Sequence, residues 1–121
     1  MISRIIPQLR TTDMTSSINF YTQKLGFIVD FNYEGFYVGI GYGDHIVHLK
    51  LVDEKDPSIK YVDDGGHLHL YLQTDDVASF AASLKAKGVS LIEDVHETAW
   101  NTREFVLNDD QGHILYFGES L

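Results

Sequence analysis

The chain has 121 residues, of which 44% are hydrophobic and 22% are charged, and its net charge is −9. This size and composition predict one soluble globular domain with a core of its own. The absence of a long apolar run excludes a membrane-spanning helix, and the acidic excess argues against a nucleic-acid partner, because phosphate binding relies on basic clusters. No residue is a cysteine, and the N-terminal residues lack a signal-peptide pattern. Together these observations favour a cytoplasmic location.

The first half of the chain predicts a strand, a helix and three further strands. Residues 2–10 begin with apolar residues and predict a strand, and Thr12 or Asp13 is a suitable helix N-cap. Apolar residues then recur at helical spacing as far as Gly26, where the helix is expected to end. Short glycine-containing breaks, typical of hairpins, separate three strand-like runs at 27–33, 36–42 and 45–52. Residues 53–65 are polar and charged and are predicted to link two halves.

The second half repeats this order. A strand is predicted at 67–73 and a helix at 76–87, followed by strands at 89–95, 102–108 and 113–118. The interval from Asp13 to Gly26 equals the interval from Asp75 to Gly88, so each predicted helix lies between an aspartate and a glycine. The order predicts an α+β fold of two βαβββ modules, which form curved antiparallel sheets with the helices outside. The modules are expected at 1–52 and 66–121, and a site is expected where they meet.

Several short motifs occur in a fixed order along nearly the whole chain. In the first half they are Ile6-Pro7-Gln8-Leu9, Ser17-Ile18-Asn19-Phe20-Tyr21 and Leu25-Gly26-Phe27. In the second half they run from His69 to Val77, from Leu84 to Val89, from Trp100 to Phe105 and from Asp110 to Phe117. In this order and spacing the motifs resemble the vicinal oxygen chelate superfamily, the glyoxalase and bleomycin resistance group. The resemblance implies the two-module fold and a homodimer.

Metal-dependent members of that superfamily hold a divalent ion with His and Glu side chains on facing strands. The resemblance places the ligand positions at Ile6, His48, His69 and Tyr116. Ile6 has no donor atom, and the Tyr116 phenol would need to lose a proton whose pKa is about 10. Two histidines without a carboxylate fall short of the three protein ligands that are usual for a catalytic metal. We therefore expect no cofactor, and if a divalent metal binds, we expect His48 and His69 to hold it.

The candidate ligand surface is aromatic and polar. Strand 67–73 alternates leucines with His67, His69 and Tyr71, and the mixed face suits a flat or amphipathic ligand. Trp100 is included because it lies in a polar loop where no core requires it. The predicted ligand-binding residues are His48, His69, Tyr71, Trp100, Tyr116, Phe36 and Tyr42. No catalytic residue is assigned.

The neighbouring Arg103 and Glu104 alternate across the sheet, so one of the two must face inward. A structural ion pair or turn support is the favoured interpretation of this pair. A general-base role for Glu104 is conceivable only if its side chain faces inward.

Three functions are compatible with this pattern. The favoured one is a metal-independent binding protein of the bleomycin-resistance type, which confers antibiotic resistance by sequestering a cationic or aromatic compound at a dimer interface. The alternative is a glyoxalase-like lyase, isomerase or thiol transferase that uses His48 and His69 to hold a metal. The third is a sensory or accessory domain whose pocket binds a metabolite. The partners expected are therefore a small molecule and a second copy of the chain, with no nucleic acid and no membrane.

Overall fold

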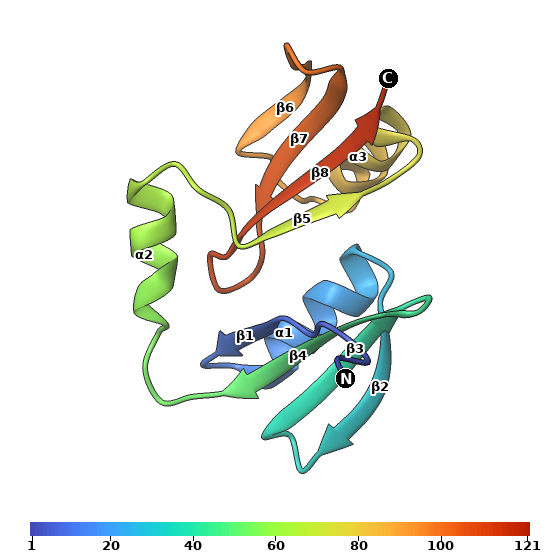
Figure 1. Cartoon of the computed structure of the whole chain (residues 1–121). Helices are drawn as coiled ribbons and strands as arrows, with labels where there is room; N and C mark the ends of the chain where they lie inside the picture. Colours follow the sequence, from blue (N-terminus) through green and yellow to red (C-terminus); the bar gives the residue numbers. More distant parts are fainter. The chain divides into compact units, whose positions relative to one another are not determined.

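The computed structural model describes all 121 residues, which divide into two compact units, Met1–Asp56 and Pro57–Leu121 (Figure 1). Unit 1 contains β1 (Gln8–Thr11), α1 (Met14–Asn19), the π-helix η1 (Phe20–Lys24), β2 (Ile28–Tyr33), β3 (Tyr37–Tyr42) and β4 (His45–Leu51). Unit 2 contains α2 (Pro57–Asp64), β5 (Leu70–Gln73), α3 (Val77–Ala86), β6 (Glu93–Glu97), β7 (Thr102–Asn108) and β8 (Ile114–Ser120). The predicted α+β fold with two βαβββ modules is confirmed.

Each unit has one four-stranded sheet, and the two sheets share a topology. The strand orders are β1-β4-β3-β2 and β5-β8-β7-β6. The prediction of purely antiparallel sheets is wrong for one pair in each sheet, because β1 runs parallel to β4 and β5 runs parallel to β8. In each unit the helix after the first strand returns the chain to the end of the sheet where that strand began. Two hairpins then give the last strand the direction of the first.

Several element boundaries differ from the predicted ones. The first strand begins at Gln8, and residues 2–7 precede it without strand structure; the Pro7 carbonyl accepts a hydrogen bond from His48 N (2.9 Å), but its ring nitrogen has no hydrogen to donate. The strand β5 also begins later than predicted, at Leu70, and β6 is shifted to Glu93–Glu97. The segment predicted as a linker contains the helix α2, which begins at Pro57, a residue favoured at the first helical position.

The helices α1 and α3 begin with equivalent caps. Asp13 Oδ1 accepts a hydrogen bond from Ser16 N, and Asp76 Oδ1 accepts one from Ser79 N, both at 3.0 Å. These bonds satisfy backbone donors that have no partner inside the helix. The equivalent of Asp13 in the second unit is therefore Asp76, one residue after Asp75.

This shift makes the helical segment of unit 1 one residue longer than that of unit 2. Both segments end at a glycine with a left-handed backbone, Gly26 (φ 86°) and Gly88 (φ 82°). The extra residue lies in a segment that continues α1 as the π-helix η1. A π-helical turn accommodates one residue more than an α-helical turn, so the two units keep equivalent caps and ends despite the difference in length.

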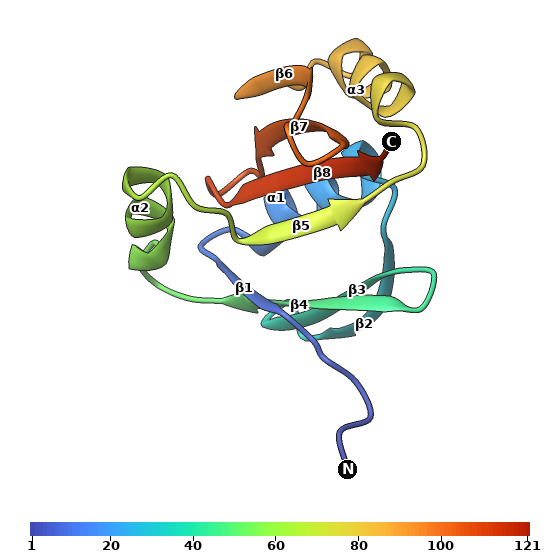
Figure 2. The same ribbon diagram turned by 45° about the horizontal axis from the view of Figure 1, so that its top comes forward.

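One face of each sheet packs against a helix and forms the core of its unit. In unit 2, α3 packs against β6, β7 and β8 (Figure 2). Phe105 and Phe117 stack there with centroids 4.9 Å apart, and Phe80 of α3 meets both rings edge-on. In unit 1, Tyr21 of η1 is fully buried and meets Phe27 edge-on. No helix has the length and apolar character needed to span a membrane.

Candidate functional site

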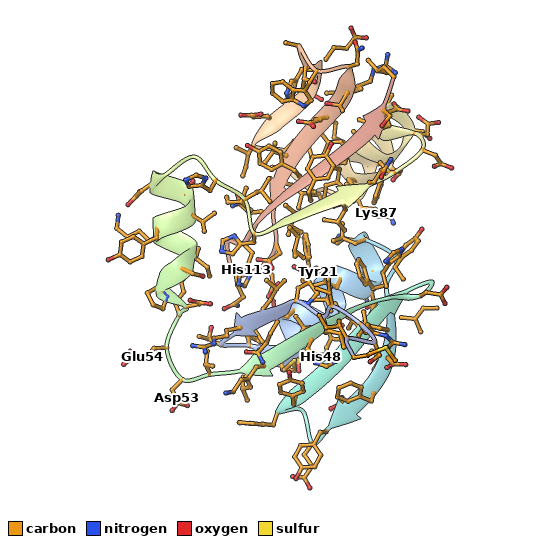
Figure 3. All side chains as sticks on the ribbon, in the orientation of Figure 1. Tyr21, His48, Asp53, Glu54, Lys87 and His113 are labelled. Atoms are coloured by element: carbon orange, nitrogen blue, oxygen red, sulfur yellow. The ribbon has the colours of Figure 1, made fainter.

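In unit 1 the sheet face away from the helix carries a hydrogen-bonded polar and aromatic cluster. His48 on β4 is labelled in Figure 3, and Gln8 on β1 and Gly39 on β3 lie on either side of it. Gln8 Nε2 donates to Tyr37 Oη (3.0 Å), and the same hydroxyl lies 3.0 Å from His48 Nδ1. The Phe31 ring stacks on Tyr37 and meets His48 edge-on. These four side chains form a connected cluster on the open face of the unit 1 sheet.

The ring of Phe31 fits on this face because of a glycine. Phe31 and Gly39 are paired on neighbouring strands, so their side chains would occupy the same face. A Cβ atom at Gly39 would lie 2.6 Å from Phe31 Cδ1, closer than carbon atoms approach in folded proteins. The missing side chain therefore provides the space that the ring occupies.

In unit 2 the corresponding face centres on Tyr71 and Glu104. The Tyr71 hydroxyl donates to Glu104 Oε2 at 2.7 Å, and Thr102 Oγ1 donates to the same oxygen at 3.0 Å. Tyr116, paired with Tyr71 across β5 and β8, places its ring centroid 6.5 Å from that of Tyr71. The Tyr71 ring lies over Gly118, where an added Cβ would be 2.6 Å from Tyr71 Cζ.

This environment raises the pKa of the Tyr71 phenol to about 12. Burial is the largest cause, followed by the hydrogen bond to Glu104 and the negative charge of that carboxylate. Loss of the phenolic proton would place a second negative charge beside Glu104. Tyr71 therefore remains a neutral hydrogen-bond donor across the physiological pH range.

Arg103 and Glu104 lie on opposite faces of the sheet, and Glu104 is the residue on the open face. Arg103 faces the other way and forms ion pairs with Glu97 (3.1 Å) and Glu119 (3.4 Å), which raise the pKa of its guanidinium. The predicted ion pair between Arg103 and Glu104 is therefore wrong, because the two side chains lie on opposite faces and Arg103 pairs with Glu97 and Glu119 instead. Glu104 itself is 4% exposed.

Protein groups already contact both imidazole nitrogens of His69 and the Nδ1 atom of His48, the two candidate metal ligands. His69, one residue before β5, accepts a hydrogen bond at Nδ1 from the Ile114 amide (3.0 Å), and its Nε2 lies 3.4 Å from Ser58 Oγ. His48 Nδ1 lies 3.0 Å from the Tyr37 hydroxyl. A metal at either Nδ1 would have to displace the existing contact, because a neutral imidazole has one lone pair available. Within either unit, no three His, Cys, Asp or Glu side chains are arranged to hold a metal ion.

The remaining predicted residues are distributed over different surfaces. Tyr42 lies on the helix side of its sheet, where its ring meets Phe27 edge-on at 5.6 Å, so the structure does not bring it together with His48. Phe36 is half-exposed in the turn before β3. Trp100 is 70% exposed in the β6–β7 turn, next to Asn101 with φ 63°. Of the predicted set, Tyr71 and Tyr116 are adjacent.

Three polar residues of these faces were not among the predicted ligand-binding residues. They are Gln8, Tyr37 and Glu104. Each of the three forms its hydrogen bond with a residue two strands away in the sheet. Such pairs depend on the strand register. For Glu104, the alternation with Arg103 is a signal in the sequence, but it does not say which of the two side chains faces inward.

Two βαβββ units, each with a helix on one sheet face and a polar, aromatic opposite face, define a glyoxalase-like protein. The chain belongs to the Glyoxalase/Bleomycin resistance protein/Dioxygenase superfamily, which it matches over residues 2–117. This confirms the predicted family. No match is found among curated proteins.

Solved structures share the fold over nearly their full length. A glyoxalase-related enzyme from Clostridium phytofermentans has a TM-score of 0.81 and 18% identity, and covers 100% of this chain and 97% of its own. TnmS3, an antibiotic binding protein from Streptomyces sp. CB03234, has a TM-score of 0.77 and 23% identity over 99% and 98%. The bleomycin-binding protein of Streptomyces verticillus, complexed with copper(II)-bleomycin, has a TM-score of 0.70 and 20% identity over 97% of each chain. At these identities the likeness establishes the fold.

Proposed function

We propose that this protein is a small-molecule-binding protein of the bleomycin-resistance type, which sequesters a cationic or aromatic compound without a metal. The observation that carries the proposal is the composition of the two open sheet faces. Each combines aromatic rings with a hydrogen-bonded polar group, around Tyr37 in unit 1 and Tyr71 in unit 2. Rings with polar handles suit flat, amphipathic ligands.

The hydrogen bonds of the histidines support the metal-free form of the proposal. His69 uses its Nδ1 lone pair to accept the Ile114 amide, so metal binding at that atom would leave a backbone donor unpaired. Among the solved structures of the same fold, TnmS3 and the Streptomyces verticillus protein are described as an antibiotic binding and a bleomycin-binding protein. Both descriptions agree with a binding role for this chain.

A second copy of the chain is part of the proposal. Unit 1 has large apolar side chains at the surface, among them Ile2 (87% exposed), Ile5 (85%) and Ile28 (75%). Exposed apolar surface of this extent is typical of interaction sites. We expect a homodimer whose interface includes residues 2–9 and lies beside the ligand site. Light scattering at micromolar concentration tests this, and a monomer would contradict a shared site.

Calorimetric titration with bleomycin and with other planar cationic compounds tests the binding function. We expect one of them to bind with a micromolar or lower Kd and to be recovered unchanged. A Trp100→Ala variant should bind at least about tenfold more weakly if the indole contacts the ligand. Tyr61→Ala removes an equally exposed ring from α2 and should bind as the wild type does. Absence of binding by every compound at millimolar concentration would contradict the antibiotic-binding function.

Elemental analysis of the purified protein separates this function from a metal-dependent glyoxalase-like enzyme. We expect less than stoichiometric Ni, Zn and Mn, and an unfolding temperature that does not respond to these ions. Metal that is retained at one equivalent and lost in His48→Ala and His69→Ala variants would support the enzyme instead.

A further inference from the structure

Glu104 is a buried carboxylate that has no cationic partner. Its side chain lies on the open face of the unit 2 sheet and is 4% exposed. Its hydrogen bonds come from two neutral hydroxyls, those of Tyr71 and Thr102, and both go to Oε2. Within unit 2, no lysine, arginine or histidine nitrogen lies within ion-pair distance of either carboxylate oxygen.

The two basic side chains nearest in register point elsewhere. Arg103, the preceding residue, forms its ion pairs with Glu97 and Glu119 on the opposite face. His96 is paired with Glu104 across β6 and β7, but its Nδ1 lies 2.9 Å from the Asp94 carbonyl oxygen. Unit 2 therefore places no positive charge of its own at this carboxylate.

Fold stability does not explain a charge at this position. Burial of a carboxylate is unfavourable unless a cation or several donors compensate it. A glutamine would accept the hydrogen bonds of Tyr71 and Thr102 through its carbonyl oxygen without that cost. The negative charge is therefore best explained by a group that is bound during function.

The direction of the hydrogen bonds determines which group fits. Tyr71 and Thr102 both direct their protons toward Glu104 Oε2, so the oxygen of Tyr71 can only accept a bond from a ligand. The fully buried side-chain atoms without a hydrogen-bond partner do not include Glu104 Oε1. As a carboxylate oxygen, Oε1 can accept a hydrogen bond but cannot donate one. The rings of Tyr71, 45% exposed, and of the adjacent Tyr116 add faces that attract cations.

We propose that Glu104 and Tyr71 form a subsite for an ammonium or guanidinium group of the bound compound. This assignment rests on the proposed binding function and specifies the chemistry of its ligand. The cation donates hydrogen bonds to the carboxylate and to the Tyr71 oxygen while it lies against the two tyrosine rings. A neutral ligand of the same shape carries no positive charge to compensate the negative charge of Glu104.

Two naphthalene probes that differ only in the group they carry test the subsite. Naphthylmethylammonium is a cation and naphthylmethanol is neutral, and fluorescence titration gives the Kd of each. We expect the cation to bind at least about tenfold more tightly, because hydrogen bonds between charged groups are stronger than neutral ones. Glu104→Gln should abolish the preference. Glu54→Gln changes the net charge equally in the segment between β4 and α2 and should retain it (Figure 3).

The unfolding temperature without any probe is a second readout. Glu104→Gln should keep or raise it, because the substitution removes a buried charge and keeps both hydrogen bonds. A marked fall would show that the charge stabilises the fold and would overturn the subsite. Equal Kd values for the two probes, or a preference that persists in Glu104→Gln, would overturn the subsite while leaving the binding function intact. Failure of both probes and of bleomycin to bind would overturn the subsite and the binding function together.

Discussion

Gln8 and Tyr71 occupy the same position in the two units and form the same kind of hydrogen bond. Each lies on the first strand of its sheet and donates across the last strand to a residue of the third, Gln8 to Tyr37 and Tyr71 to Glu104. The residues beside them on the last strands, His48 and Tyr116, are also equivalent by register. The two units thus share one bonding scheme with different chemistry. Unit 1 carries an amide, a phenol and an imidazole, whereas unit 2 carries a phenol and a carboxylate.

The alkaline titration of Tyr71 should be displaced from that of an ordinary tyrosine. Its pKa is raised from 10.0 to about 12, so its contribution to the free energy of unfolding is complete below pH 10 and is lost as the pH rises toward 12. The difference in phenolate absorbance between the wild type and Tyr71→Phe measures this pKa. Glu104→Gln should lower it only part of the way, because burial is the largest cause and remains. A Tyr71 that titrates near pH 10 in the wild type would contradict the bond to Glu104.

Gly118→Ala should displace the Tyr71 ring without changing either member of its hydrogen bond. The new methyl group would lie 2.6 Å from Tyr71 Cζ, so the ring must move. We expect the raised pKa of Tyr71 to fall toward 10 and the preference for cationic probes to weaken. Gly39→Ala introduces the same methyl group beneath Phe31 in unit 1 and should leave the Tyr71 titration unchanged. An unaltered titration in Gly118→Ala would show that the ring does not depend on the glycine.

Phe105→Ala should destabilise the fold strongly, because the ring is fully buried and stacks on Phe117. We expect a loss of about 3–5 kcal/mol in the free energy of unfolding, measured by urea denaturation. Trp100→Ala removes a larger side chain that is 70% exposed and should change the free energy by less than about 0.5 kcal/mol. Comparable losses in the two variants would contradict the assignment of Trp100 to the surface.

Asp76→Ala should cost about 1 kcal/mol of stability, because it removes the acceptor for the Ser79 amide at the start of α3. Asp75→Ala, one residue earlier, should have little effect on thermal unfolding. The reverse ranking would show that Asp75 is the cap and that the helical segments of the two units have equal lengths.

Apart from the helix α2, the sequence predicts the order of the elements, because local chemistry determines it. Capping aspartates, glycines after helices and short breaks between apolar runs mark the elements, and Glu34 and Gly35 do form a turn with positive φ at both residues. The parallel pairs β1–β4 and β5–β8 are not predictable in this way, since they join segments far apart in the chain.

Site residues are harder to predict because strand register decides which face a side chain occupies. Tyr37 and Tyr42 are five positions apart on β3 and must therefore lie on opposite faces of the strand. The sequence does not show which of them faces the helix, and the predicted set contained Tyr42. The same ambiguity applies to Arg103 and Glu104, and it is resolved only when the Tyr71–Glu104 bond is seen.

The rings over Gly39 and Gly118 allow the open sheet faces to be reshaped without disturbing the sheets. In both units, part of the open face is formed by a side chain from a neighbouring strand that covers bare backbone. Shortening Phe31 or Tyr71 would uncover a shallow recess, while the main-chain hydrogen bonds beneath would keep their partners. Such positions allow the shape of the open face to change through single substitutions at low cost to the fold.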